Sequence, residues 1–388
     1  MSKYADDLER NVRVRRLVDE WTRSGLLTPA QQTAVIADVP VDVRRTNRFL
    51  RVTMGAFGLL IIAATVALVV VTLKPNEEQA AGVICLIAAA GCIALAEFLI
   101  SRFRLYRFGV EEACAIGAVV LAGVGSGLLF SDWYVPVGDR RILIALLAGS
   151  AAAWAVYRRY GLVYGAFAAM LGLGLAPSEL GLRDIVQRSI AFGAIGACLI
   201  VAREKHRQHG DEYPGDDYGL IEAAAWAGAY AVVNLHLGGG WFANRYPAWF
   251  VWLTYGAIWL LPAVALWLSV REKNRPLLDV GLVMAIGTLV TNKPYLGLER
   301  KPWDPILLGA LLIGAAIAVR RWLTSGPDGL RGGFTSAQIL RSDEEVLARV
   351  AAASTAFQPG IAPRATEPPP ADPFGGGRSG GGGAGASY

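Results

Sequence analysis

Charge, histidine and cysteine are scarce in this chain of 388 residues. Only 18% of its residues are charged and 54% are hydrophobic, whereas soluble domains contain about 25% charged and about 45–50% apolar residues. The four cysteines lie inside apolar runs, without a C-x-x-C pair or a neighbouring histidine: Cys85, Cys92, Cys114 and Cys198. This pattern predicts buried thiols and excludes the usual metal and disulfide frameworks.

Catalytic motifs are lacking at membrane depth, where no G-x-S-x-G, H-E-x-x-H or Ser/His/Asp set can be assembled. We therefore expect no catalysis and no cofactor. The net charge of +5 is typical of some nucleic-acid-binding proteins, but the basic residues flank apolar segments. Membrane topology explains that placement directly, so we expect no nucleic-acid partner.

Long apolar segments make up most of the chain, and a membrane-spanning helix needs about 20 such residues. We predict an all-α, polytopic transmembrane bundle with ten spans: 53–73, 80–100, 109–130, 142–157, 161–177, 185–202, 219–237, 248–270, 277–292 and 305–319. Eight or nine spans are the alternatives, because 185–202 begins with Gln187 and Arg188, 277–292 is short, and 305–319 abuts two arginines.

The distribution of basic residues tests this count, because cytoplasmic loops carry an excess of Lys and Arg. Clusters of two or three occur in every second connection: Arg102, Arg104, Arg107; Arg158, Arg159; Arg203, Lys205, Arg207; Arg271, Lys273, Arg275; Arg320, Arg321. The intervening connections carry Lys74; Arg140, Arg141; Arg183; Arg245; and Lys293, Arg300, Lys301, so the bias is weak only in the last of them. The pattern predicts a multi-pass protein of the cytoplasmic membrane with both termini in the cytoplasm. Its first partner is then the lipid bilayer, and the first span would act as an uncleaved signal.

Two polar ends flank this transmembrane region, 49–322. We predict a cytoplasmic helical hairpin for residues 1–48. For residues 323–354 we predict a cytoplasmic segment with a short helix capped by Ser342, and for 355–388 a disordered Pro/Gly-rich tail.

The hairpin has clear helix signals. Thr28, Pro29 and Gln31 predict a capped helix start, and Gly25 ends the preceding helix, which covers about residues 5–23. The pair is too small to fold alone, so we expect Trp21, Leu26 and Ile36 to dock it on the membrane end of the chain, on a second copy or on another protein. A DNA-reading helix-turn-helix is disfavoured because forty residues supply too little core.

The spacing Trp21-x-x-x-Gly25-Leu26-Leu27-Thr28-x-x-Gln31, followed by a basic connection and a glycine-containing span, covers about residues 8–70. It resembles the start of bacterial membrane proteins of the Domain of Unknown Function 2157 family. The resemblance implies a bacterial inner-membrane protein but no activity.

Ionisable side chains inside spans are functional candidates, because burial of a charge in hydrocarbon is costly. Glu111, Glu112, Glu222 and Asp279 lie near predicted cytoplasmic ends, where they either pair with neighbouring arginines or form an acidic vestibule. Glu222 and His236, with Asn234 beside them, fall on one face of 219–237. Pro262, in the next span, could free a backbone carbonyl for a ligand.

Two functions follow. The first is a structural, assembly or regulatory protein without catalysis. The second is a small-molecule or ion transporter of five-plus-five helices, which requires a polar pathway through the spans.

Overall fold

The computed structural model describes residues 6–44, 46–75, 77–130, 140–208, 217–237, 246–299, 301–326, 330–331 and 334–335. All of them belong to one compact unit, Met1–Ser336. The helix expected after Ser342 and the tail 355–388 lie outside the described residues.

The all-α prediction is confirmed. The described residues form twelve α-helices: α1 (Asp6–Arg23), α2 (Pro29–Asp38), α3 (Arg48–Leu73), α4 (Glu78–Phe103), α5 (Val110–Leu129), α6 (Arg140–Tyr160), α7 (Val163–Leu175), α8 (Asp184–Gln208), α9 (Tyr218–Val233), α10 (Ala248–Glu272), α11 (Arg275–Tyr295) and α12 (Asp304–Thr324). A 3₁₀ turn, η1 (Ala176–Leu180), continues α7, and two short strands, β1 (Leu330–Arg331) and β2 (Phe334–Thr335), pair antiparallel.

Each of the ten predicted spans corresponds to one helix from α3 to α12, and eight of these, with α7 counted together with η1, are long and apolar enough to cross a membrane. The exceptions are α9, which has 16 residues, and α11. The α9 helix packs against α7, α8, α10 and α11. Because its side chains face protein, its apolar segment need not be as long as that of a helix surrounded by lipid. In contrast, α3 and α12 expose most of their apolar side chains.

Helix ends differ from the predicted ones in a systematic way. The α8 helix continues to Gln208 and α10 to Glu272, beyond the apolar runs, because Arg, Lys, Glu and Gln favour helix. The α9 helix is instead shorter than predicted. It ends at Val233, where Asn234 has an extended backbone and the next amide, Leu235 N–H, donates to the Tyr295 hydroxyl at 2.9 Å.

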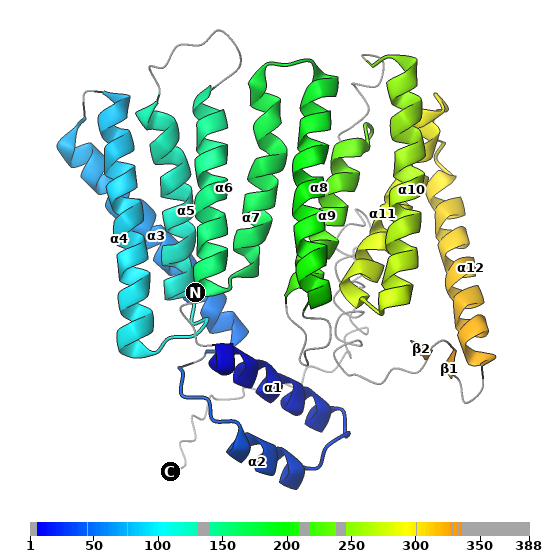
Figure 1. Cartoon of the computed structure of the whole chain (residues 1–388), viewed down its shortest axis with the longest axis horizontal. Coiled ribbons are helices and arrows are strands. Elements are labelled where there is room, and N and C mark those ends of the chain that lie inside the picture. Colours follow the sequence, from blue (N-terminus) through cyan, green and yellow to red (C-terminus); the bar gives the residue numbers. More distant parts are fainter. Residues whose placement is uncertain are drawn as a thin grey trace, which may run out of the picture. The chain divides into compact units, whose positions relative to one another are not determined.

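Neighbours along the chain pack as neighbours in space through α4, α5, α6 and α7, while α3 lies against α5, and α9 contacts both α8 and α11 (Figure 1). At the α4–α5 contact, a Cβ on Gly82 would lie 2.8 Å from the Gly125 carbonyl oxygen, and one on Gly125 would lie 2.9 Å from the Gly82 oxygen. Glycine at both positions therefore permits this close approach, as small residues do between membrane helices.

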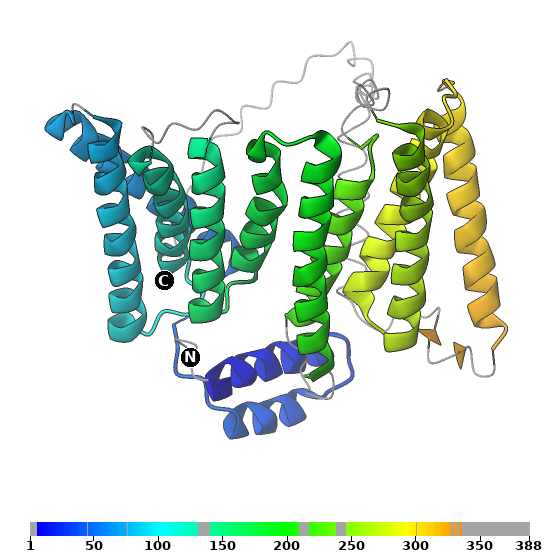
Figure 2. The same cartoon turned by 45° about the horizontal axis from the view of Figure 1, so that its top comes forward.

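The α1–α2 pair lies across the lower ends of the helices in both views (Figures 1 and 2). We call this the hairpin end. The ends of α4, α6, α8, α10 and α12 lie there, so the five basic clusters predicted to share one side do share it.

Candidate functional site

A buried ion-pair group joins α8, α9 and α10 at the hairpin end. Arg203 donates from Nη1 to Glu222 Oε1 at 2.7 Å and from Nη2 to Glu272 Oε1 at 2.5 Å. The Glu222 residue is 0% exposed. Among the described residues, Oε2 of Glu222 and Oε2 of Glu272 have no hydrogen-bond partner. One guanidinium therefore holds two carboxylates together, and each carboxylate keeps an oxygen available.

The same face of α9 carries further polar groups at intervals of four residues. After Glu222 come Trp226, Tyr230 and Asn234, and this interval places them in one row along a helix. Asn234 donates from Nδ2 to the Tyr230 hydroxyl at 2.9 Å and to Thr291 Oγ1 at 3.0 Å. The Tyr230 hydroxyl lies 3.0 Å from Thr288 Oγ1. These side chains form a buried network between α9 and α11.

Pro262 explains one end of this network. Proline has no N–H, so within α10 the carbonyl of Ile258, four residues earlier, lacks its helical donor. Thr288 Oγ1 of α11 donates to that carbonyl at 2.6 Å. The carbonyl is thus satisfied by a protein group, and α10 continues unbroken to Glu272. The carbonyl expected to serve a ligand serves the contact between α10 and α11 instead.

Apolar packing separates the ion-pair group from the hydroxyl network. Ile258, Leu277 and Met284 are at most 2% exposed and form one cluster with Trp226. The Trp226 Nε1–H is buried and has no acceptor among the described residues. In this conformation the row on α9 is therefore two polar groups with an apolar layer between them.

The structure does not bring the other candidate residues to this row. Glu112 and Glu111 begin α5, where Glu112 binds Arg51 of α3 through two hydrogen bonds and Glu111 accepts from Phe108 N–H at 2.5 Å. Asp279 is exposed and makes no ion pair within the described ranges. His236 lies beyond α9, with its ring edge-on to Tyr295 at 4.5 Å between centroids, so it is not on the helix face predicted to carry it.

Ion pairing near the membrane boundary is present, but with partners other than the arginines nearest in sequence. Glu97 accepts from Arg159 Nε at 2.8 Å and from the Tyr160 hydroxyl at 3.1 Å. Its partner therefore comes from α6 rather than from the basic cluster after its own helix. Arg51 and Arg203 likewise come from helices other than those of the carboxylates that they bind. Sequence distance is a poor guide here, because antiparallel helices bring remote ends together.

The hairpin docks on its own chain through Val12, a residue that sequence reasoning missed. Val12 is 1% and Val18 is 2% exposed, and Val12 belongs to the core cluster that contains Tyr106, Tyr160 and Leu162. Burial raises the pKa of the Tyr106 phenol above its ordinary value. The available signal was an apolar residue, Val12, among the arginines of this helix.

The three residues expected to anchor the hairpin are less buried. Leu26 is 55% exposed, while Trp21 and Ile36 are only partly buried. The two helices are instead joined by polar contacts: Arg15 donates from Nε to the Val39 carbonyl at 2.8 Å. The expected capping box is present, with Gln31 N–H donating to Thr28 Oγ1 and Thr28 N–H to Gln31 Oε1.

Ion pairs also join the hairpin to the α4–α5 loop and to the start of α9. Arg107, between α4 and α5, and Arg13 of α1 each lie within 4 Å of both Glu9 and Asp217, the residue before α9. The backbone of Arg44 pairs with the α4–α5 loop, donating to the Arg104 carbonyl at 3.0 Å and accepting from Tyr106 N–H at 3.1 Å. The hairpin is therefore tied to both the α4–α5 loop and the start of α9.

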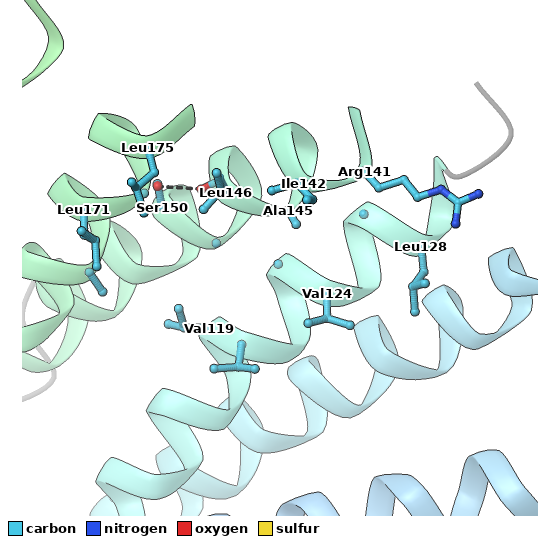
Figure 3. A pocket seen from close by; sticks show the side chains of 16 residues that line it. Val119, Val124, Leu128, Arg141, Ile142, Ala145, Leu146, Ser150, Leu171 and Leu175 are labelled. Carbon is cyan, nitrogen blue, oxygen red and sulfur yellow. Dashed lines mark hydrogen bonds between the residues drawn. The ribbon is translucent and has the colours of Figure 1, made fainter. Parts of the chain in front are cut away.

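An apolar cavity of about 500 Å³ lies among α5, α6 and α7 (Figure 3). Its lining includes Arg141, which pairs with Glu78 at 2.6 Å, and Ser150, whose hydroxyl donates to the Leu146 carbonyl of its own helix at 2.6 Å. Both polar groups are thus already engaged, so this cavity offers no group for catalysis.

Comparisons of the chain with protein-family models, with curated proteins and with solved structures found no significant match.

Proposed function

We propose that this chain is a multi-pass protein of the bacterial cytoplasmic membrane with a structural, assembly or regulatory role and no catalytic activity. All ten helices from α3 to α12 cross the bilayer, and both termini lie in the cytoplasm. The hairpin presents a binding surface to another protein or to a second copy. The resemblance of residues 8–70 to the Domain of Unknown Function 2157 family is part of this proposal and adds no activity to it.

One observation carries the proposal: α1 is held to the membrane helices while α2 faces away. Val12 is buried in the cluster with Tyr106 and Tyr160, and the charges of Glu9 and Arg13 meet the α4–α5 loop and Asp217. Every residue of α2, all of them described, is at least partly exposed. A fixed hairpin with an accessible outer helix is suited to contact a partner at the membrane surface.

The span count is supported by the surroundings of α9. Although it has only 16 residues, four other helices cover it, and a helix shielded from lipid need not meet the length and hydropathy of an isolated span. The alternation of basic clusters also requires α9 and α11 to cross, because without both crossings the later clusters would not follow the same alternation.

The experiment uses cysteine accessibility in vesicles of known orientation. Leu26→Cys, in the hairpin, should react with a membrane-impermeant maleimide only in inverted vesicles, and Leu298→Cys, between α11 and α12, only in right-side-out vesicles. A photo-crosslinker on the introduced cysteine at 26 should then capture a protein of fixed mass. Reaction of both positions from the same side contradicts the topology, and capture of lipid alone contradicts the assembly role.

Transport of a proton or small cation is the second candidate, and the Glu222 group favours it. A fully buried carboxylate with one free oxygen is costly in a membrane protein and is often part of an ion pathway. The apolar layer of Ile258, Leu277 and Met284 argues for the first proposal, because a pathway would require these side chains to move apart.

A further inference from the structure

Arg107, in the loop between α4 and α5, has a left-handed backbone with a φ of 50°. A residue with a Cβ avoids this conformation, because the Cβ lies too close to the following carbonyl oxygen. Among the described residues, three others with side chains adopt it: Lys74, Arg104 and Lys273. Each of these three caps the C-terminus of a helix, where left-handed residues are common. Arg107 caps no helix, so other contacts hold its backbone in this conformation.

The side chain of Arg107 joins three segments at the hairpin end. Its Nη2 lies 3.6 Å from Glu9 Oε1 of α1 and 3.8 Å from Asp217 Oδ2 before α9. The same nitrogen donates to the carbonyl of Gly161, between α6 and α7, at 3.4 Å. Only 21% of the Arg107 side chain is exposed. These contacts offset the conformational cost of the left-handed backbone, and one of them depends on the hairpin.

The hairpin also holds the backbone of this loop directly before Arg107. Arg44 N–H donates to the Arg104 carbonyl at 3.0 Å, and Tyr106 N–H donates to the Arg44 carbonyl at 3.1 Å. Val12 of α1 lies in the same buried cluster as the Tyr106 side chain. All of these contacts require a docked hairpin. Without them Arg107 keeps fewer contacts, and a backbone with negative φ becomes favoured.

We propose that the hairpin is a conformational switch. Its docked state holds Arg107 in the left-handed conformation and fixes Asp217 at the start of α9, and its release lets both relax. The inference rests on the proposed function, in which α2 contacts a partner: a partner that displaces the hairpin would thereby act on α9, the helix that carries Glu222. Because such coupling is reciprocal, a substitution that alters only the backbone preference at position 107 must shift the docking equilibrium.

The test compares Arg107→Gly with Arg107→Ala in the full-length protein. Both variants lose the guanidinium, and only alanine keeps the cost of the left-handed backbone, about 5- to 30-fold in an equilibrium constant. The greater freedom of glycine in the released loop offsets part of this difference and leaves about fivefold. Amide hydrogen exchange in α1 and α2 should therefore be about fivefold faster in Arg107→Ala. Equal exchange in the two variants, with the hairpin still docked, overturns the proposal.

Lys74→Gly and Lys74→Ala form the matched control pair. Lys74 also has a left-handed backbone, with a φ of 42°, but it follows α3 at the end of the helices opposite the hairpin. Both control variants should show wild-type exchange in α1 and α2. A fivefold difference between them would show a general effect of glycine on the fold and would contradict coupling through the loop.

A second measurement needs no change in the loop and decides the matter if both Arg107 variants release the hairpin completely. Leu220 N–H and Ile221 N–H, in the first turn of α9, donate to the Asp217 carbonyl at 3.2 and 3.1 Å. Loss of a partly exposed ion pair changes an equilibrium by up to about fivefold. These two amides should therefore exchange about fivefold faster in Val12→Asp and at the wild-type rate in Leu26→Asp.

Unchanged exchange at the start of α9 in Val12→Asp, with the hairpin released, would refute the switch. These measurements use the chain without a partner. A failure to capture a partner would therefore count against the proposed function and leave the coupling intact.

Discussion

Replacement of Val12 by aspartate is the most direct test of how the hairpin is held. Val12 is 1% exposed in a cluster with Tyr106, Tyr160 and Leu162. The variant Val12→Asp removes this apolar contact and forces a carboxylate into the same space. We expect the hairpin to separate from the ends of the membrane helices while the helices themselves stay folded, because Val12 lies outside them.

The magnitude follows from the burial of this side chain. Full burial of a valine contributes about 1.5–3 kcal/mol, and an unpaired charge left in a buried site costs about 3–5 kcal/mol. Even a conservative value of about 3 kcal/mol changes the docking equilibrium more than a hundredfold. Leu26→Asp, at a 55% exposed site, should change it by less than about 0.5 kcal/mol.

Amide hydrogen exchange over α1 and α2 measures this equilibrium, because undocking exposes the helix amides to solvent. Val12→Asp should accelerate exchange in the hairpin at least a hundredfold and leave α4 to α7 unchanged. Leu26→Asp should match the wild type, and Trp21→Ala should fall between them because Trp21 is half-buried. If Leu26→Asp releases the hairpin as strongly as Val12→Asp, the docked arrangement is wrong and an external partner holds this segment.

Two further predictions concern the interior. If the α9 row conducts protons, Glu222→Gln should abolish proton flux into liposomes and Asp279→Asn should not; equal flux in wild type and Glu222→Gln would leave only the structural role. Thr288→Val removes the donor to the Ile258 carbonyl and should lower the free energy of unfolding by about 1–3 kcal/mol. The measurement is the temperature at which the monodisperse peak is lost on heating, which should be lower in the variant. Thr65→Val, on the exposed α3 where the hydroxyl bonds within its own helix, is the control and should be near neutral.

The sequence alone determined the class of the fold because membrane helices are specified locally. A run of about 20 apolar residues must satisfy its backbone hydrogen bonds internally and therefore forms a helix wherever it lies in the bilayer. All ten predicted segments from 53–73 to 305–319 contain a helix for this reason. The capping box at Thr28 and Gln31 was equally predictable, because both partners lie within four residues.

Partner choice is what only the tertiary structure decided. The sequence placed Glu222 and Glu112 near membrane boundaries, but Arg203 and Arg51 became their partners through the packing of separate helices. The Ile258 carbonyl freed by Pro262 could have faced a ligand, and the approach of α11 gave it Thr288 instead.

The contacts of the hairpin, too, were decided only by the tertiary structure. Its amphipathic residues could be recognised in the sequence, and Trp21 was favoured there because it offers the largest apolar surface. Docking selected the smaller Val12, because the surface it meets, around Tyr106 and Tyr160, exists only after α4, α5 and α6 have packed together. Burial depends on the shape of the opposing surface as well as on side-chain size, and that shape is set by contacts between residues far apart in the chain.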